Sequence, residues 1–134
     1  MFYKSNDFNI MKTIIQTKEA PSAIGPYSQA VKINGILFTS GQIAINPKTN
    51  KLEIDDLTHE TNLVMNNLKA VLKQGGMDFT NVVKTTIFLK NMNDFALVNE
   101  IYASFFEGNY PARETVQVAK LPKDVNVEIS MIAV

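Results

Sequence analysis

The chain has 134 residues, the length of one domain with a single sizeable core. Its 13 basic and 13 acidic residues give no net charge, so no overall field attracts nucleic acid or an anionic membrane. Cysteine is absent and His59 is the only histidine. This composition excludes disulfides, thiolate catalysis and any metal site built from several histidines.

No apolar run approaches the ~20 residues that cross a bilayer, and residues 1–10 lack the continuous apolar stretch of a secretory signal. A second methionine, Met11, follows this segment. We interpret residues 1–10 either as an unstructured N-terminal extension or as a misassigned start, and 11–134 as the single folded domain. Together with the lack of cysteine, these features predict a cytoplasmic protein.

The first half of the chain reads mainly as strands and turns. A short strand is predicted at 12–17, and the proline- and glycine-rich segment 19–30 is predicted to be a loop. Residues 30–41 form two β-rich runs around Asn34-Gly35, a pair typical of a type I′ hairpin turn. Residues 46–51 are predicted to form another turn.

Two helices are expected. Apolar residues recur at helical spacing over 56–73, with Asp56 or Thr58 as the N-cap and Gly75-Gly76 as the stop. After a predicted strand at 81–90, Asn93 is expected to cap a second helix that ends at Gly108. The apolar stripe of this second helix is predicted to be core: Phe95, Val98, Tyr102 and Phe105.

Two further strands are predicted near 114–119 and 125–133, separated by KLPK. The resulting order, β-ββ-α-β-α-ββ, predicts an α+β fold with both helices on one face of a mostly antiparallel sheet. If the last two strands form a hairpin with their valines against the helices, Arg113 and Glu128 share the opposite face. Phe88 and Ile132 lie on that face by parity, which favours subunit packing there.

Arg113 is the only arginine among 13 basic residues. On the strand pattern alone, the favoured interpretation of Arg113 and Glu128 is a surface ion pair with little effect on stability. A functional interpretation needs the longer motifs around them.

Four stretches resemble, in order, motifs of the reactive intermediate deaminases, the RidA/YjgF family. The resemblance runs from about Lys12 to Val134. The stretches are AIGPYSQAV, LFTSGQIAINPKTN, VVKTTIFLKNMNDFALVNEIYASFF and YPARETVQVAKLPKDVNVEISMIAV.

This resemblance implies a chorismate-mutase-like fold and a homotrimer whose strands form a central barrel, with active sites between subunits. It also implies the activity of a 2-iminobutanoate/2-iminopropanoate deaminase. Such an enzyme hydrolyses 2-imino acids, formed from enamines such as 2-aminoacrylate and 2-aminocrotonate, to 2-keto acids and ammonia. No metal or other cofactor is implied.

The resemblance also implies roles for individual residues. Arg113 matches the arginine that binds the substrate carboxylate, and Glu128 matches the catalytic acidic residue. Tyr27, Ser40 and Gly41 match residues that line the substrate site, although a tyrosine after a Gly-Pro turn could equally plug a loop, and a Ser-Gly pair could equally end a strand. Thr115 matches a further substrate-binding position, where many family members have cysteine, and this difference bears on the rate and the substrate preference more than on the activity itself.

These residue types suit imine hydrolysis. The guanidinium of Arg113 can hold a planar carboxylate with two parallel hydrogen bonds, whereas lysine offers a point charge. Glu128 can take a proton from water and return it to the leaving nitrogen.

Two alternatives remain open. A non-catalytic module that binds 2-keto acids or other small carboxylates would also keep Arg113. A ribonuclease that inhibits translation is less favoured, because the lysines are scattered and the single histidine provides no imidazole pair.

Overall fold

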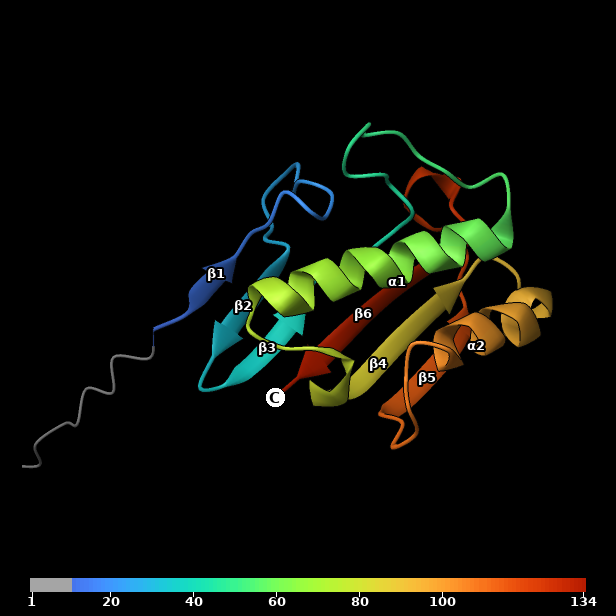
Figure 1. The fold of residues 1–134 in the computed structure, drawn as a ribbon. Helices are drawn as coiled ribbons and strands as arrows, with labels where there is room; N and C mark the ends of the chain where they lie inside the picture. Colours follow the sequence, from blue (N-terminus) through green and yellow to red (C-terminus); the bar gives the residue numbers. More distant parts are fainter. Residues whose placement is uncertain (1–10) are drawn as a thin grey trace, which may run out of the picture.

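The computed structural model describes residues 11–134, so the interpretation of residues 1–10 lies outside the described part of the chain. Six strands form one sheet in the order β1-β2-β3-β6-β4-β5, and both helices lie on one of its faces (Figure 1). The predicted α+β class and the predicted order of elements are therefore confirmed. The strands and helices are β1 (Thr13–Ile15), β2 (Ala30–Ile33), β3 (Ile36–Thr39), α1 (Leu57–Gln74), β4 (Val82–Leu89), α2 (Phe95–Ala103), β5 (Ala112–Gln117) and β6 (Val127–Ala133).

The β2–β3 hairpin turns where the sequence predicts it. Asn34 and Gly35 have φ angles of 50° and 75°, so both turn residues are in the left-handed region that a type I′ turn requires. Asparagine and glycine adopt this region at low cost, and the turn therefore fixes the register of the hairpin.

Helix α1 begins and ends as predicted. The Asp56 side chain accepts a hydrogen bond from the His59 backbone at 2.7 Å, and the helix stops at Gly75. Its inner side packs against the sheet and is fully buried at Val64, Leu68 and Val71. Within residues 11–134, no helix is long and apolar enough to cross a membrane.

The predicted cap and length of the second helix are wrong. Asn91, not Asn93, caps a short 3-10 turn (η2, Met92–Asp94), and α2 begins only at Phe95. The extended backbone of Asn91 lets its side chain accept from the Asn93 backbone, so the cap bond is made two residues earlier. The helix ends at Ala103 and does not extend to Gly108. The predicted stripe does pack in the core, with Val98 and Tyr102 buried.

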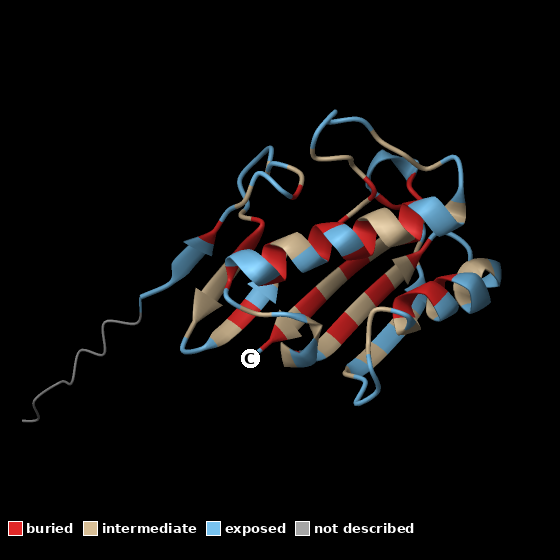
Figure 2. Ribbon diagram, viewed as in Figure 1, coloured by how far each residue is buried: buried red, intermediate tan, exposed pale blue. Residues whose placement is uncertain are grey.

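Strand β6 lies in the middle of the sheet and alternates as expected. Val127, Ile129, Met131 and Ala133 are buried beneath the helices, and the residues between them are partly exposed on the opposite face. Figure 2 shows the buried positions as red stripes along β6, β4 and the inner side of α1.

The predicted hairpin between the last two strands is wrong. Strand β5 pairs in parallel with β4, where Thr85 lies beside Arg113 and Ile87 beside Thr115. Thr85 and Ile87 are buried under the helices. Arg113 therefore points to the helix face and Glu128, which pairs with Phe88, to the other face. The two residues do not share a face within one chain.

The sheet face opposite the helices is mixed, with apolar side chains beside hydroxyl and charged ones, and it has no other layer over it within residues 11–134. Phe38 pairs with Ile132 at its centre, and Phe88 pairs with Glu128 further along. Phe38 is 40% exposed and Val116, on edge strand β5, is 43% exposed. The predicted positions of Phe88 and Ile132 on this face are confirmed. We call this surface the open face.

Candidate functional site

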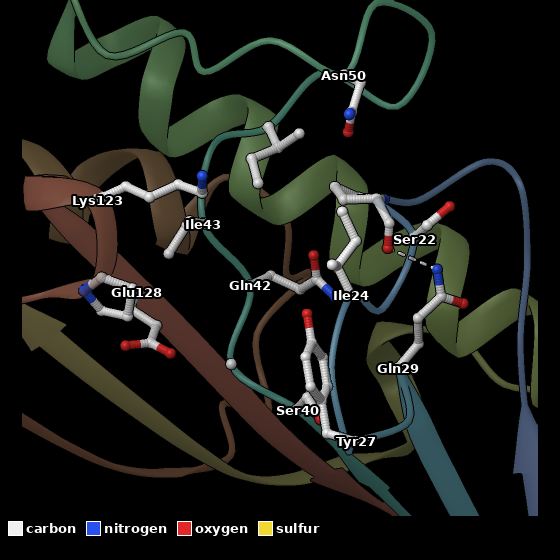
Figure 3. A pocket seen from close by; sticks show the side chains of 14 residues that line it. Ser22, Ile24, Tyr27, Gln29, Ser40, Gln42, Ile43, Asn50, Lys123 and Glu128 are labelled. Atoms are coloured by element: carbon white, nitrogen blue, oxygen red, sulfur yellow. Dashed lines mark hydrogen bonds between the residues drawn. The ribbon is translucent and has the colours of Figure 1, made fainter.

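A cavity of about 610 Å³ opens between the loop before β2, the segment after β3 and the start of β6 (Figure 3). Four of the residues predicted for the site line it: Tyr27, Ser40, Gly41 and Glu128. Arg113 and Thr115 do not. The other lining residues are Pro21, Ser22, Ile24, Gln29, Gln42, Ile43, Ile45, Asn50, Pro122 and Lys123.

A β-bulge at the end of β3 forms the floor of this cavity. Phe38 pairs with Ile132 and Gln42 pairs with Ile129, so one strand advances four residues while the other advances three. The extra residue falls in the Ser40–Gly41 region and turns the chain away from the sheet. A bulge of this kind commonly shapes a functional site, and here it exposes the backbone beside Glu128.

Gly41 is needed because the Glu128 side chain occupies the space above it. A Cβ atom added at Gly41 would collide with the Glu128 carboxylate. The carboxylate therefore lies directly against the Gly41 backbone, and any larger residue at this position would displace it.

Glu128 is half-buried in the cavity wall, and burial raises the pKa of its carboxyl group. Among residues 11–134, no side chain forms an ion pair with it. A carboxylate that is desolvated and uncompensated binds a proton more readily than an exposed one, which is the property required of a general base that later acts as an acid.

The loop that carries Tyr27 is organised by Gln29, a buried residue that the sequence analysis missed. The Gln29 amide donates to the carbonyls of Thr17 and Pro21 at 3.0 and 2.8 Å and accepts from the Thr17 backbone at 2.7 Å. These side-chain bonds satisfy backbone groups of the loop that have no strand partner to bond with. The Gln29 side chain therefore holds the loop in place, and the only sequence signal for it was a polar residue beside a buried strand.

Tyr27 and Ser40 differ in how free their hydroxyl groups are. Tyr27 is 53% exposed, and in Figure 3 its ring extends along the cavity wall toward Gln42. The Ser40 hydroxyl donates to the Ser28 carbonyl at 2.5 Å, which joins the loop to the end of β3. Ser40 thus makes a structural bond and also lines the cavity.

Arg113 lies on the other side of the sheet, in a second hollow formed by α2 and the segment before β5. Its guanidinium donates to the Asn99 side chain at 2.6 Å. The guanidinium carbon is 5.6 Å from the ring centre of Phe95 and 5.1 Å from that of Tyr102. The cation is therefore held by aromatic faces and one amide, with further donors left for a ligand.

Thr115 follows Arg113 on the same face of β5. Its hydroxyl oxygen is buried and has no hydrogen-bond partner among residues 11–134. An unpaired buried hydroxyl is unfavourable, so this position is better suited to a side chain without a strong polar atom.

His59, the only histidine, lies at the start of α1 with 58% of its side chain exposed and its ring 3.4 Å from Glu53. It does not line the cavity. Among residues 11–134, no group of three histidine, aspartate or glutamate side chains could hold a metal ion.

The comparisons with known proteins agree with this architecture. A family model described as Endoribonuclease L-PSP matches residues 17–134. A RutC family protein of Pyrococcus horikoshii is 49% identical over 123 residues, covering 92% of this chain and 98% of that protein. A 2-iminobutanoate/2-iminopropanoate deaminase of Mus musculus is 47% identical over 126 residues, covering 94% of this chain and 93% of that protein.

Solved structures give the same result. A protein of unknown function of the conserved Rid family from Yersinia pestis is 53% identical and superposes with a TM-score of 0.90, covering 92% of this chain and 98% of that one. Sequence identity and fold therefore agree over nearly the whole described chain, and the chain belongs to the RidA/YjgF family.

Proposed function

We propose that this protein hydrolyses 2-imino acids, released as enamines such as 2-aminoacrylate and 2-aminocrotonate, to 2-keto acids and ammonia in the cytoplasm. The observation that carries the proposal is Glu128: a half-buried carboxylate with a raised pKa, lying against a glycine backbone in an open cavity. The mouse relative named as a 2-iminobutanoate/2-iminopropanoate deaminase supports the same reaction.

The reaction proceeds in two steps. Glu128 removes a proton from a water molecule whose oxygen attacks the imine carbon, and the C=N bond becomes a C–N single bond. The nitrogen takes up this proton, which gives a carbinolamine. The nitrogen is then protonated a second time, the hydroxyl group gives up its proton as the C=O bond forms and the C–N bond breaks, and ammonia leaves. Both protons of the water thus end on the nitrogen, with Glu128 as the group that transfers them. The substrate is already electrophilic, so orientation of water and imine supplies much of the acceleration, and no cofactor is needed.

The proposal requires more than one copy of the chain. Arg113 and Glu128 point to opposite faces of the sheet, so one chain cannot present both to a single small substrate. We propose a homotrimer in which Arg113 of a neighbouring copy reaches the cavity that holds Glu128. The partly exposed apolar residues of the open face support such an assembly, because burying them would stabilise it.

The decisive experiment couples the protein to a pyridoxal-phosphate-dependent dehydratase that releases imines from serine or threonine. Semicarbazide is added as a competing trap. The wild-type protein should lower the trapped fraction of both imines and raise free ammonia. If the trapped fraction is the same with and without protein, the chain is not an imine hydrolase, and 2-keto acid binding alone would then indicate a carboxylate-binding module.

Glu128→Gln is predicted to lose this activity without losing stability. The amide keeps the shape of the side chain and removes the proton acceptor, and it relieves the desolvation that raises the pKa of Glu128. A carboxyl group with a raised folded pKa contributes stability at low pH that is lost as pH rises through that pKa. At neutral pH the variant should therefore melt no lower than the wild type.

Because burial raises the pKa of Glu128, protonation of this carboxylate should stop the reaction at a higher pH than for an ordinary glutamate. The acidic limb of the wild-type pH–rate profile should therefore fall at a pH above the ordinary pKa of glutamate. Melting curves and initial rates across pH 4 to 8, roughly the window in which a raised carboxyl pKa falls, test both statements. Wild-type turnover in Glu128→Gln would assign the proton transfer to another group.

A further inference from the structure

One charged residue in the cavity is not used by the proposed reaction. Among the described residues, 11–134, Lys123 is the only basic side chain that lines the cavity, and Glu128 is the only acidic one. In Figure 3 the extended Lys123 side chain points inward, toward the part of the wall that Gln42 and Ile43 form. The cavity therefore contains an ammonium group as well as a general base.

The backbone that presents Lys123 is in an unusual conformation. Lys123 and Asp124, in the short 3-10 turn η3 (Pro122–Asp124), have φ angles of 54° and 56°. This left-handed region is unfavourable for residues with a Cβ atom, by about 1 kcal/mol or more for each. Two such residues in succession persist only if the surrounding structure holds them there.

The surrounding contacts hold the turn firmly. Leu121 and Val125 are buried on either side of it, and the Asp124 carboxylate lies 3.0 Å from the Lys90 ammonium. On the C-terminal side, the Asn126 backbone and side chain donate to Glu60 at 2.8 and 2.7 Å. Buried neighbours and the Asn126–Glu60 hydrogen bonds therefore flank the turn, and the exposed side chain of Lys123 extends from it.

The Lys123 ammonium is available for a ligand. Within residues 11–134 no carboxylate lies within ion-pair distance of it, whereas Lys84 and Lys90 are each paired with an acidic side chain. Glu128, which shares the cavity, is not its partner, and burial alone accounts for the raised pKa of Glu128. The two charged groups are therefore each free to contact a bound molecule.

We propose that Lys123 binds a second carboxylate, at the end of the substrate side chain, so that the site accepts dicarboxylic 2-imino acids and their 2-keto acid products. This inference rests on the proposed function. Arg113 of the neighbouring copy holds the carboxylate next to the imine carbon, Glu128 acts at that carbon, and Lys123 binds the distal carboxylate. A cavity of about 610 Å³ has room for such a molecule.

Equilibrium binding of two keto acids tests the proposal without requiring turnover. Titration calorimetry is carried out with 2-oxoglutarate, which has a distal carboxylate, and with 2-oxobutanoate, which has a methyl group there. The wild-type protein should bind 2-oxoglutarate about tenfold more tightly, the expected effect of one charge-assisted hydrogen bond. This preference should weaken as salt concentration rises, because Lys123 is exposed.

Lys123→Met should remove most of the preference for 2-oxoglutarate, because methionine keeps an unbranched apolar stem and lacks the ammonium group that makes the charge-assisted bond. The affinity for 2-oxobutanoate should change by no more than about twofold. Lys120→Met is the matched control, because Lys120 is an exposed lysine of the same segment outside the cavity. This control should keep the wild-type preference.

Two other outcomes would overturn the proposal, and a third would separate it from the proposed reaction. Equal losses for both keto acids in Lys123→Met would mean that Lys123 binds the carboxylate beside the reacting carbon. No preference in the wild type would mean that Lys123 is an ordinary surface lysine, even if the dehydratase assay shows imine hydrolysis. Failure of that assay with the preference intact would refute the proposed reaction and leave the dicarboxylate site in place.

Discussion

The guanidinium of Arg113 is oriented before any ligand binds. Phe95 and Tyr102 lie within cation–π distance of it, and Asn99 accepts one of its hydrogen bonds. Such a preorganised fork loses little conformational freedom when a carboxylate arrives. At the scale of single residues, Arg113 therefore combines a packing contact on α2 with the geometry needed for bidentate binding.

Arg113→Lys is predicted to lower both activity and stability. Lysine keeps the charge but loses the planar fork, so kcat/KM should fall by about 30- to 1000-fold, or ~2–4 kcal/mol. Loss of the Asn99 bond and the aromatic contacts should also lower the free energy of unfolding by about 1–2 kcal/mol.

Asn99→Ala provides the control for Arg113→Lys, since it removes the 2.6 Å bond and keeps the guanidinium. It should share the loss of stability but keep most of the activity. Coupled-assay kinetics and denaturant unfolding, measured on the same preparations of both variants, separate the loss of activity from the loss of stability. Normal kinetics in Arg113→Lys would remove Arg113 from the proposed site.

Thr115→Val is predicted to stabilise the protein. The valine side chain has nearly the shape of threonine, and it replaces a buried hydroxyl that has no partner among the described residues. The free energy of unfolding should rise by about 1 kcal/mol in denaturant titrations.

Thr85→Val is the matched control for Thr115→Val. The buried Thr85 hydroxyl accepts from the Tyr102 hydroxyl at 3.0 Å, so its loss should lower stability. A destabilised Thr115→Val protein would mean that a neighbouring copy supplies a partner for Thr115.

At the scale of elements, Glu60 connects α1 to the beginning of β6. Its carboxylate is fully buried and accepts two hydrogen bonds from Asn126, two residues before Glu128. Burial raises the pKa of Glu60, with the Asn126 bonds opposing this rise. A helix thereby fixes the start of the strand that presents the proposed base.

The raised pKa of Glu60 predicts a pH dependence of stability. Because the folded pKa lies above the ordinary value, the folded state binds more protons between the two values, and stability falls as pH rises through that window. Glu60→Gln does not titrate. The stability of the wild type relative to this variant should therefore decline from acidic toward neutral pH in parallel denaturant titrations.

Glu100→Gln, on the exposed side of α2, serves as the control for the pH series. An unchanging difference between wild type and Glu60→Gln across the series would show that Glu60 titrates as it does in the unfolded chain.

Local patterns predicted much of the fold from the sequence. The Asn34-Gly35 turn, the Asp56 cap and the alternation of β6 each depend on residues close together in the chain. The cavity residues Tyr27 and Glu128 came from the family resemblance. Local patterns alone could not have brought them together, because the loop that positions Tyr27 is held by the distant contacts of Gln29.

The partner of β5 could not be predicted in this way. Its alternating valines suit pairing with β4 or with β6 equally well, and the choice depends on contacts far apart in sequence. The prediction assumed that the valines of this strand face the helices. In the structure β5 is an edge strand, and Val116 is 43% exposed on the open face. That one error also put Arg113 on the wrong face.

At the scale of the whole molecule, the open face predicts assembly. The homotrimer should have a mass about three times the 15.0 kDa of the chain in light scattering after size exclusion. Phe38→Lys places a charge at the centre of the open face and should yield monomers that lack imine hydrolysis.

Leu97→Lys is the matched control for Phe38→Lys, because Leu97 is also 40% exposed but lies on α2, away from the open face. It should leave the mass unchanged. A wild-type monomer at micromolar concentration would contradict both the trimer and a site shared between subunits.

The central position of β6 also affects how the chain folds during synthesis. The strand order β1-β2-β3-β6-β4-β5 leaves two separate pieces, of three and two strands, until residues 127–133 pair between them. A nascent chain that has not yet released β6 from the ribosome therefore exposes the apolar side of α1 and the unpaired edges of β3 and β4. Final folding waits for this last strand, and a chaperone that shields strand edges would be needed most just before it emerges.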